Sequence, residues 1–297
     1  MREEQVEVPG GSLWTVTHGL GPPLVLCHGG PGLSDNLGPL ASLIDDEFRV
    51  HRFDQRGAGR SSTSGPFDVP TFVADLEVLR RHWGHDRWVV GGHSWGATLA
   101  VLYALAHPDR VDAVLYVAGT GIRWGWQEET RRHRLARLTD AERAELALLE
   151  SQDHPLSPDA QRRVLRLMWQ TDFADPARAA EVLAREPLYA FPRDPRVFRE
   201  VSASLKHELE GPVETSLRHL AAPVLVLHGD HDADPSRTRR VADLAPAGRF
   251  CEIERAGHSP WLEQPDAVGT AIRQFLSESP SEPAGMQDGH RPAEDAR

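Results

Sequence analysis

Short runs of leucine and β-branched residues alternate with longer helical patterns along most of the chain. Two of the intervening segments, 71–82 and 95–107, predict helices, and the second is apolar almost all round, as a helix that faces a core should be. This alternation is typical of a parallel sheet with helices on both faces. The runs predicted as strands are residues 13–17, 24–27, 50–53, 87–90, 111–117, 224–228 and 250–253.

The strand pattern stops in the middle of the chain and returns after it. Between residues 121 and 212 the sequence has helical segments rich in arginine and alanine, separated by prolines. We therefore predict a helical cap, 121–212, inserted into a core made of 1–120 and 213–276. Residues 277–297 are rich in Ser, Pro, Glu and Asp, so this tail is predicted to be disordered. The fold class is α/β, with a mostly parallel, twisted sheet flanked by helices.

Composition and charge narrow the class of protein. The chain has 297 residues, of which 40% are hydrophobic and 26% charged, the balance of a globular protein with a sizeable core. A formal net charge of -11 argues against broad attraction to nucleic acid or to an anionic membrane, so small molecules or short peptides are the expected substrates. No apolar run is long enough to span a membrane, and the first ten residues lack the features of a signal peptide. Since the two cysteines lie in strand-like runs, we expect a cytoplasmic protein without disulfides.

The strongest motif is Gly92-His93-Ser94-Trp95-Gly96, a G-x-S-x-G sequence between a predicted strand and an apolar helix. The glycines allow a sharp turn that projects the serine hydroxyl above the sheet. The helix that follows begins with backbone N–H groups and a partial positive charge, which stabilise an oxyanion. The motif thus predicts Ser94 as a nucleophile and the Trp95 N–H as an oxyanion donor.

A serine nucleophile needs a base and a carboxylate that orients the base. His258 follows the predicted strand 250–253 and a glycine, and it is the expected base. The loop after strand 224–228 contains Asp230, Asp232 and Asp234, and sequence alone does not separate them. We favour Asp232, three residues after Gly229, with Asp230 as the alternative. Both partners follow the carboxyl ends of strands, where sites in open α/β sheets collect.

A second glycine motif, His28-Gly29-Gly30-Pro31-Gly32, follows the strand 24–27. A side chain at this place would block the approach of a substrate carbonyl to a backbone N–H, so the Gly30 N–H is predicted to be the second oxyanion donor. The sequence has no metal-ligand spacing such as His-Glu-x-x-His and no dinucleotide or phosphate loop. No metal and no cofactor are therefore predicted.

Together with the segment from Asp54 to Ser61, Asp-Gln-Arg-Gly-Ala-Gly-Arg-Ser, these two motifs resemble the proline iminopeptidase branch of the α/β-hydrolase fold. The resemblance covers residues 10–120 and 220–275. It implies an α/β-hydrolase core in which the Asp54 segment braces the floor of the active site. It also implies that an amino-terminal proline or a similar residue is released from a small peptide.

The cap departs from this resemblance. In proline iminopeptidases, glutamates on the cap helices bind the free amino terminus of the peptide, and aromatic residues hold the proline ring. Here Gln170 stands where a Trp-Glu pair would be sought, and no cap residue is assigned to substrate. Hydrolysis of carboxylic esters with the same triad is the alternative function, and a binding module without turnover is a further one. The candidate cap glutamates are Glu181, Glu186, Glu200, Glu208 and Glu210, and the candidate aromatic residues are Trp124, Trp126, Trp169, Tyr189 and Phe191.

Overall fold

The computed structural model describes residues 1–152, 156–185 and 194–278. Its centre is a twisted sheet in the order β1-β2-β4-β3-β6-β7-β8-β9, with β5 paired to β2. The pairs from β4 to β9 along this order are parallel, whereas β2 pairs antiparallel with β1, β4 and β5. The strands are β1 (Arg2–Val8), β2 (Gly11–His18), β3 (Pro23–Cys27), β4 (Arg49–Phe53), β5 (Ser62–Thr63), β6 (Trp88–His93), β7 (Val111–Val117), β8 (Val224–Gly229) and β9 (Gly248–Ile253).

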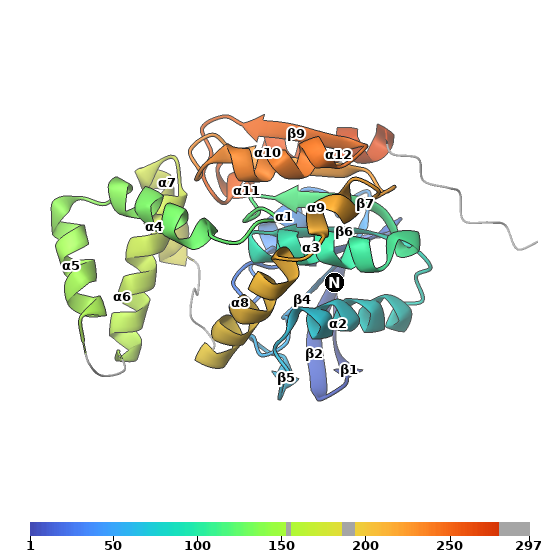
Figure 1. The fold of residues 1–297 in the computed structure, drawn as a ribbon, viewed down its shortest axis with the longest axis horizontal. Coiled ribbons are helices and arrows are strands. Elements are labelled where there is room, and N and C mark those ends of the chain that lie inside the picture. The colour runs from blue at the N-terminus through green and yellow to red at the C-terminus, as the bar shows by residue number, and fades with distance from the viewer. Residues whose placement is uncertain (153–155, 186–193, 279–297) are drawn as a thin grey trace, which may run out of the picture.

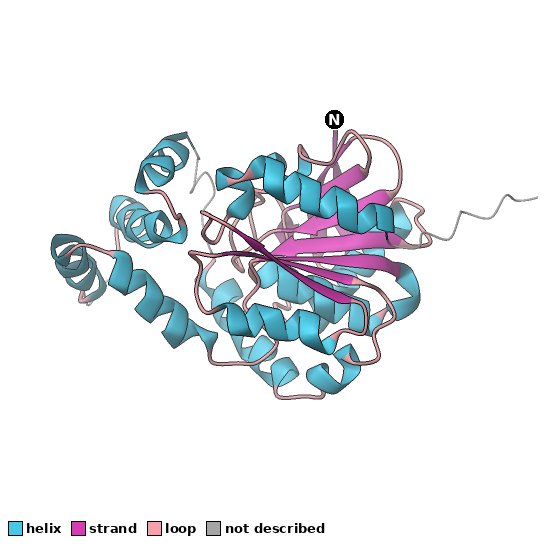
Figure 2. Ribbon diagram, turned by 90° about the horizontal axis from the view of Figure 1, so that it is seen from above, coloured by secondary structure: helices cyan, strands magenta, loops and turns pink. Residues whose placement is uncertain are grey.

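Helices cover both faces of the sheet, as Figure 2 shows from above. One apolar cluster joins one face to α2, α3, α8, α9 and α10, and a second joins the other face to α1, α11 and α12. The helices outside the cap are α1 (Gly38–Ala41), α2 (Val69–His82), α3 (Trp95–Ala106), the 3-10 turn η1 (Pro108–Arg110), α9 (Val213–Leu217), α10 (Pro235–Leu244), α11 (Pro260–Glu263) and α12 (Pro265–Glu278). These layers confirm the predicted mostly parallel sheet between helices.

A helical insertion follows β7 and precedes α9. Figure 1 shows α4 to α7 set to one side of the sheet, with α8 leading back to the core. Leu138, Leu146 and Leu167 form a small apolar cluster of their own within the insertion. The inserted helices are α4 (Trp126–Arg137), α5 (Asp140–Glu150), α6 (Pro158–Trp169), the 3-10 turn η2 (Gln170–Asp172), α7 (Pro176–Arg185) and α8 (Pro195–Leu209).

At the amino-terminal end, the hydrophobic pattern does not predict β1, because polar residues fill its exposed positions and only Val6 and Val8 are buried. The predicted disordered tail lies outside the described residues from position 279 onward, and residues 277 and 278 end α12. No helix in the described ranges is long and apolar enough to cross a bilayer.

A buried ion pair joins the loop after β4 to α2. The Arg56 guanidinium donates two hydrogen bonds to the Asp75 carboxylate, at 2.9 and 2.6 Å, and both side chains are at most 3% exposed. Burial raises the pKa of Asp75, and Arg56 opposes this effect. We expect Asp75→Asn to lower the free energy of unfolding by about 3–5 kcal/mol, because it leaves a buried arginine charge unpaired.

Urea denaturation of the two proteins measures this loss. The matched control is Asp86→Asn, which breaks a surface pair with Arg110 in which the Asp86 side chain is 84% exposed. The free energy of unfolding of Asp86→Asn should fall by less than about 1 kcal/mol. Equal losses in both variants would show that burial is not what makes the Arg56–Asp75 pair important.

Candidate active site

Ser94 lies at the sharp turn between β6 and α3. Its φ of 56° is in the left-handed region, and its N–H donates to the Val117 carbonyl at 3.0 Å. A side chain at Gly92 would place its Cβ 2.2 Å from the Gly96 carbonyl oxygen, and one at Gly96 would lie 2.1 Å from that of Cys27. The two glycines of the motif are therefore required by close backbone approach, and the turn holds Ser94 at the end of the sheet.

His258 and Asp232 meet across two neighbouring loops. His258 Nδ1 lies 2.9 Å from Asp232 Oδ2, and these side chains are 15% and 11% exposed. The Ala233 N–H donates to Asp232 Oδ1 at 2.8 Å. Since the carboxylate occupies Nδ1, the imidazole has Nε2 left for a substrate or a nucleophile.

The other two aspartates of this loop have different partners. Asp230 Oδ1 lies 2.6 Å from the His231 ring and accepts from the Ala256 N–H at 3.1 Å. Asp234 caps α10 and accepts from the Ser236 N–H at 2.9 Å. Among the three, the residue that contacts His258 is Asp232.

The charges around His258 favour the protonated ring. Burial by itself lowers the pKa of His258, but the carboxylates of Asp232 and Asp172 outweigh it and raise this pKa above 6.5, against an opposing effect of Arg134. Burial raises the pKa of Asp232, yet His258 and His228 hold this pKa well below its usual range. Asp232 is thus ionised at neutral pH and stabilises an imidazolium at position 258.

The backbone of His258 is held on both sides. Its N–H donates to the Asp172 carbonyl of η2 at 2.7 Å. Its carbonyl lies 2.9 Å from His93 Nε2, which must carry the proton because a carbonyl only accepts. Burial lowers the pKa of His93 well below 6.5, so this ring is neutral.

Glu263 joins the loop of His258 to the cap. Its carboxylate accepts from the N–H of Gly257 at 2.7 Å, of Ala174 at 2.9 Å and of Asp175 at 3.1 Å. Together with the hydrogen bond between the Asp172 carbonyl and the His258 N–H, these bonds fix the segment after η2 to the loop of His258. This role of Glu263 was not predicted from the sequence, because its partners are backbone groups and two of them lie far away in the chain.

A cavity of about 360 Å³ lies between the core and the cap. Ser94, His258, Asp232 and Gly30 all line it, so the structure brings these predicted residues to one place. Within the described ranges the Ser94 hydroxyl makes no hydrogen bond, and the printed partner of the His258 ring is Asp232. Catalytic hydrogen bonds are often long or poorly aligned in enzymes without bound substrate. Much of the remaining lining is apolar and comes from the cap: Trp126, Leu165, Met168, Trp169, Phe173, Val182, Leu183 and Phe198.

The two predicted oxyanion donors flank Ser94. Gly30 has a φ of +132°, in the region that favours glycine. A Cβ on the neighbouring Gly29 would come within 3.2 Å of the Ser94 Cβ, so this loop passes close to the serine. Trp95 is the first residue of α3, where an N–H has no acceptor within the helix, and its side chain is buried away from the cavity.

The cap residues singled out in the sequence lie in different places. Gln170 does not line the cavity, and its amide donates to Glu142 at 2.6 Å. Of the aromatic candidates, Trp126 and Trp169 line the cavity, whereas Trp124 packs against the core. Tyr189, Phe191 and Glu186 lie outside the described residues.

Comparison with known proteins agrees with this architecture. Residues 22–265 match the family model described as the alpha/beta hydrolase fold. A curated proline iminopeptidase of Heyndrickxia coagulans is 28% identical over 287 residues, covering 88% of this chain and 92% of that protein. These matches confirm the resemblance that the three motifs indicate.

Two solved structures are similar in fold. The proline iminopeptidase of Mycobacterium smegmatis has a TM-score of 0.66 at 24% identity, covering 94% of this chain and 98% of that one. A thermophilic esterase of Thermogutta terrifontis has a TM-score of 0.69 at 24% identity, covering 94% and 99%. At this identity both likenesses concern the fold alone.

Proposed function

The chain belongs to the α/β-hydrolase fold family, and we propose that it is a serine hydrolase that acts through an acyl-enzyme on Ser94. The observation that carries this proposal is the grouping of Ser94, the hydrogen-bonded pair of His258 and Asp232, and Gly30 around one cavity. Such a grouping is the arrangement that acyl transfer requires.

In the proposed reaction His258 Nε2 takes the proton of the Ser94 hydroxyl as its oxygen attacks the substrate carbonyl. The Gly30 and Trp95 N–H groups stabilise the oxyanion, and Asp232 stabilises the imidazolium. His258 then gives the proton to the leaving group, and the acyl-Ser94 ester forms. Water, deprotonated by the same imidazole, attacks this ester and releases the acid and the free serine.

The preferred substrate we propose is a small peptide from which an amino-terminal proline or a similar residue is released. Support comes from the curated proline iminopeptidase that is similar over most of the chain. The three motifs that resemble this family lie in the core, around Gly30, Asp54 and Ser94.

Hydrolysis of carboxylic esters is the second candidate, and the charges of the cavity favour it. Each carboxylate that the described residues present to the cavity already has a partner. Asp172 accepts two hydrogen bonds from Arg134 at 2.7 and 2.8 Å, Asp232 binds His258, and Asp234 caps α10. Of the cap glutamates considered for an ammonium group, Glu181, Glu200 and Glu210 form ion pairs with neighbouring arginine or lysine residues and do not line the cavity.

A substrate panel separates the two candidates. If the protein is an aminopeptidase, prolyl-β-naphthylamide should be hydrolysed, and acetylation of its amine should lower kcat/KM by at least about tenfold, because a charged hydrogen bond is lost. Short acyl p-nitrophenyl esters with no amine test the esterase. Turnover of these esters with no reaction of the free-amine substrates would reject the peptidase and keep the acyl-Ser94 mechanism.

A further inference from the structure

Gln55 connects the two loops that carry the proposed oxyanion donors. Its side-chain amide donates to the His28 carbonyl at 2.6 Å, and its side-chain oxygen accepts from the Trp95 indole N–H at 2.8 Å. Its backbone N–H donates to His28 Nε2 at 2.9 Å. All three residues are at most 2% exposed, so water does not compete for these bonds.

The bond from the Gln55 backbone fixes the tautomer of His28. Because Nε2 accepts a hydrogen bond from the Gln55 N–H, the ring proton of His28 is on Nδ1. Nδ1 donates it to the Gly29 carbonyl at 2.7 Å. The Gly29 carbonyl and the Gly30 N–H belong to one trans peptide unit and point in opposite directions. The hydrogen bond from His28 to the Gly29 carbonyl therefore orients the Gly30 N–H toward the opposite side of the peptide unit.

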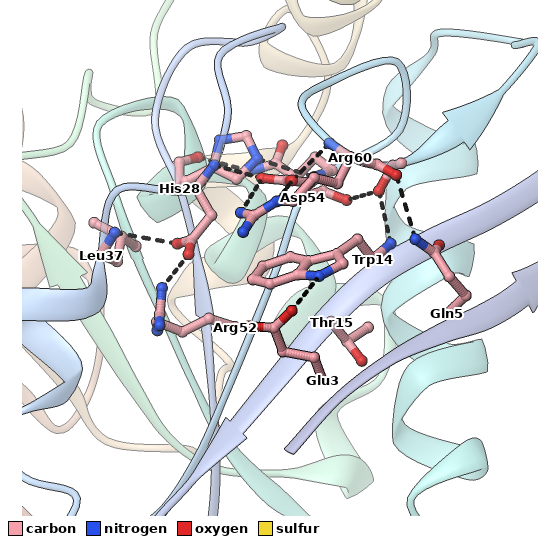
Figure 3. A network of polar contacts seen from close by, with 12 residues as sticks. Glu3, Gln5, Trp14, Thr15, His28, Leu37, Arg52, Asp54 and Arg60 are labelled. Carbon is pink, nitrogen blue, oxygen red and sulfur yellow. Dashed lines mark hydrogen bonds and ion pairs between the residues drawn. The ribbon is translucent and has the colours of Figure 1, made fainter. Parts of the chain in front are cut away.

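The loop of Gln55 is itself held firmly. The Asp54 carboxylate is fully buried and accepts from the Asp35 N–H at 2.6 Å and from the Arg60 N–H at 2.8 Å. Figure 3 shows this polar network around Asp54, with His28 and Arg60 in it. A Cβ at Gly59 would lie 2.3 Å from the same carboxylate, so the loop closes tightly around it.

We propose that Gln55 is a positioning residue of the oxyanion hole, setting the Gly30 N–H through His28 and the start of α3 through the Trp95 indole. This inference rests on the proposed function, in which those two N–H groups bind the oxyanion. A primary amide is required because the side chain has to donate to a carbonyl and accept from an indole at once. Glutamate would present only oxygen to the His28 carbonyl, and methionine would leave both partners without a hydrogen bond.

The test compares Gln55→Met and Gln55→Glu with the wild-type full chain on whichever substrate of the panel turns over. Loss of one oxyanion donor typically lowers kcat by about a hundred- to a thousand-fold, and misplacement should cost about ten- to a hundred-fold. KM should change by less than about threefold, because the ground-state carbonyl depends little on the oxyanion donors. Inhibition by an alkyl boronic acid, which forms a tetrahedral anion on the serine, should weaken by the same factor as kcat/KM.

The matched control is Gln274→Met, on the exposed face of α12, which should leave kcat and boronate inhibition unchanged. Unchanged boronate inhibition in the Gln55 variants, or a higher KM at constant kcat, would overturn the inference. If the Gln55 variants do not fold, Trp95→Phe removes the indole donor together with part of a buried ring, and the same signature in kcat and boronate inhibition is expected. Failure of the proposed function is a different result, in which the wild-type chain hydrolyses no ester or amide and is not inhibited by the boronate.

Discussion

Replacing Ser94 by alanine is expected to lower kcat by about 10⁵- to 10⁶-fold on any substrate that the wild-type chain hydrolyses. No acyl-enzyme forms without the hydroxyl, and the histidine and the oxyanion donors alone leave only a residual rate. The turn should survive the change, because its strain is set by a backbone φ of 56° and the hydroxyl makes no hydrogen bond within the described ranges. Kinetics on the best substrate of the panel and thermal unfolding measure both expectations.

Covalent labelling identifies the nucleophile directly. A fluorophosphonate should add once to the wild-type chain and not to Ser94→Ala, as read by intact mass. The control variant is Ser277→Ala, an exposed serine of the last helix, which should label like the wild type. Labelling of Ser94→Ala at an undiminished rate would exclude Ser94 as the nucleophile. Absence of labelling in the wild-type chain, beside a serine hydrolase that does label, would favour a binding module instead.

Sequence was sufficient for the parts of the site that are formed locally. The turn at Ser94 depends on a strand, two glycines and a helix that are contiguous in the chain, and the predicted limits of β7 agree with the observed strand. Short-range patterns of this kind report hydrophobic periodicity and backbone freedom, which neighbouring residues determine. β1 was not predicted, because its stability comes from pairing with β2 and not from its own hydrophobic pattern.

Long-range contacts could not be read from the sequence. Glu263 lies close to His258 in the sequence. Its hydrogen bonds to Ala174 and Asp175, however, depend on how the cap packs on the core. The Asp172 carbonyl that accepts from the His258 N–H is a backbone group, which any residue type would supply. The three aspartates after β8 were likewise inseparable, because one or two residues of displacement in a loop decide which carboxylate faces the imidazole.

Hydrogen bonds therefore tie the inserted helices to the loop of His258 at η2. His258 is held by the cap through its N–H and by the serine turn through its carbonyl, since His93 belongs to the same motif as Ser94. A displacement of the cap at η2 would move the imidazole relative to the nucleophile.

Asp232→Asn is expected to lower kcat by about 10⁴-fold, because the amide no longer stabilises the imidazolium and favours the wrong tautomer of His258. The pH dependence should change as well. The active base is the neutral ring, so in the wild type kcat/KM should fall as the pH drops through the pKa of His258, which Asp232 and Asp172 raise above 6.5 despite burial. Removing the Asp232 charge takes away an effect that raises this pKa, so the midpoint of the acid limb should move to lower pH while the plateau falls.

The control for this change is Asp230→Asn, two residues earlier in the same loop and bonded to His231 and the Ala256 N–H. It should retain kcat within about fivefold, because its carboxylate does not contact His258 and acts only on the loop. Profiles of kcat/KM between pH 5 and 9 for the three proteins give both the plateau and the midpoint. Full activity in Asp232→Asn with a large loss in Asp230→Asn would transfer the role of the acid to Asp230, and it would mean that the loop rearranges when substrate binds. A fall in the plateau with no movement of the midpoint would instead assign Asp232 to orientation of the ring, with the raised pKa of His258 owed to Asp172 in the cap.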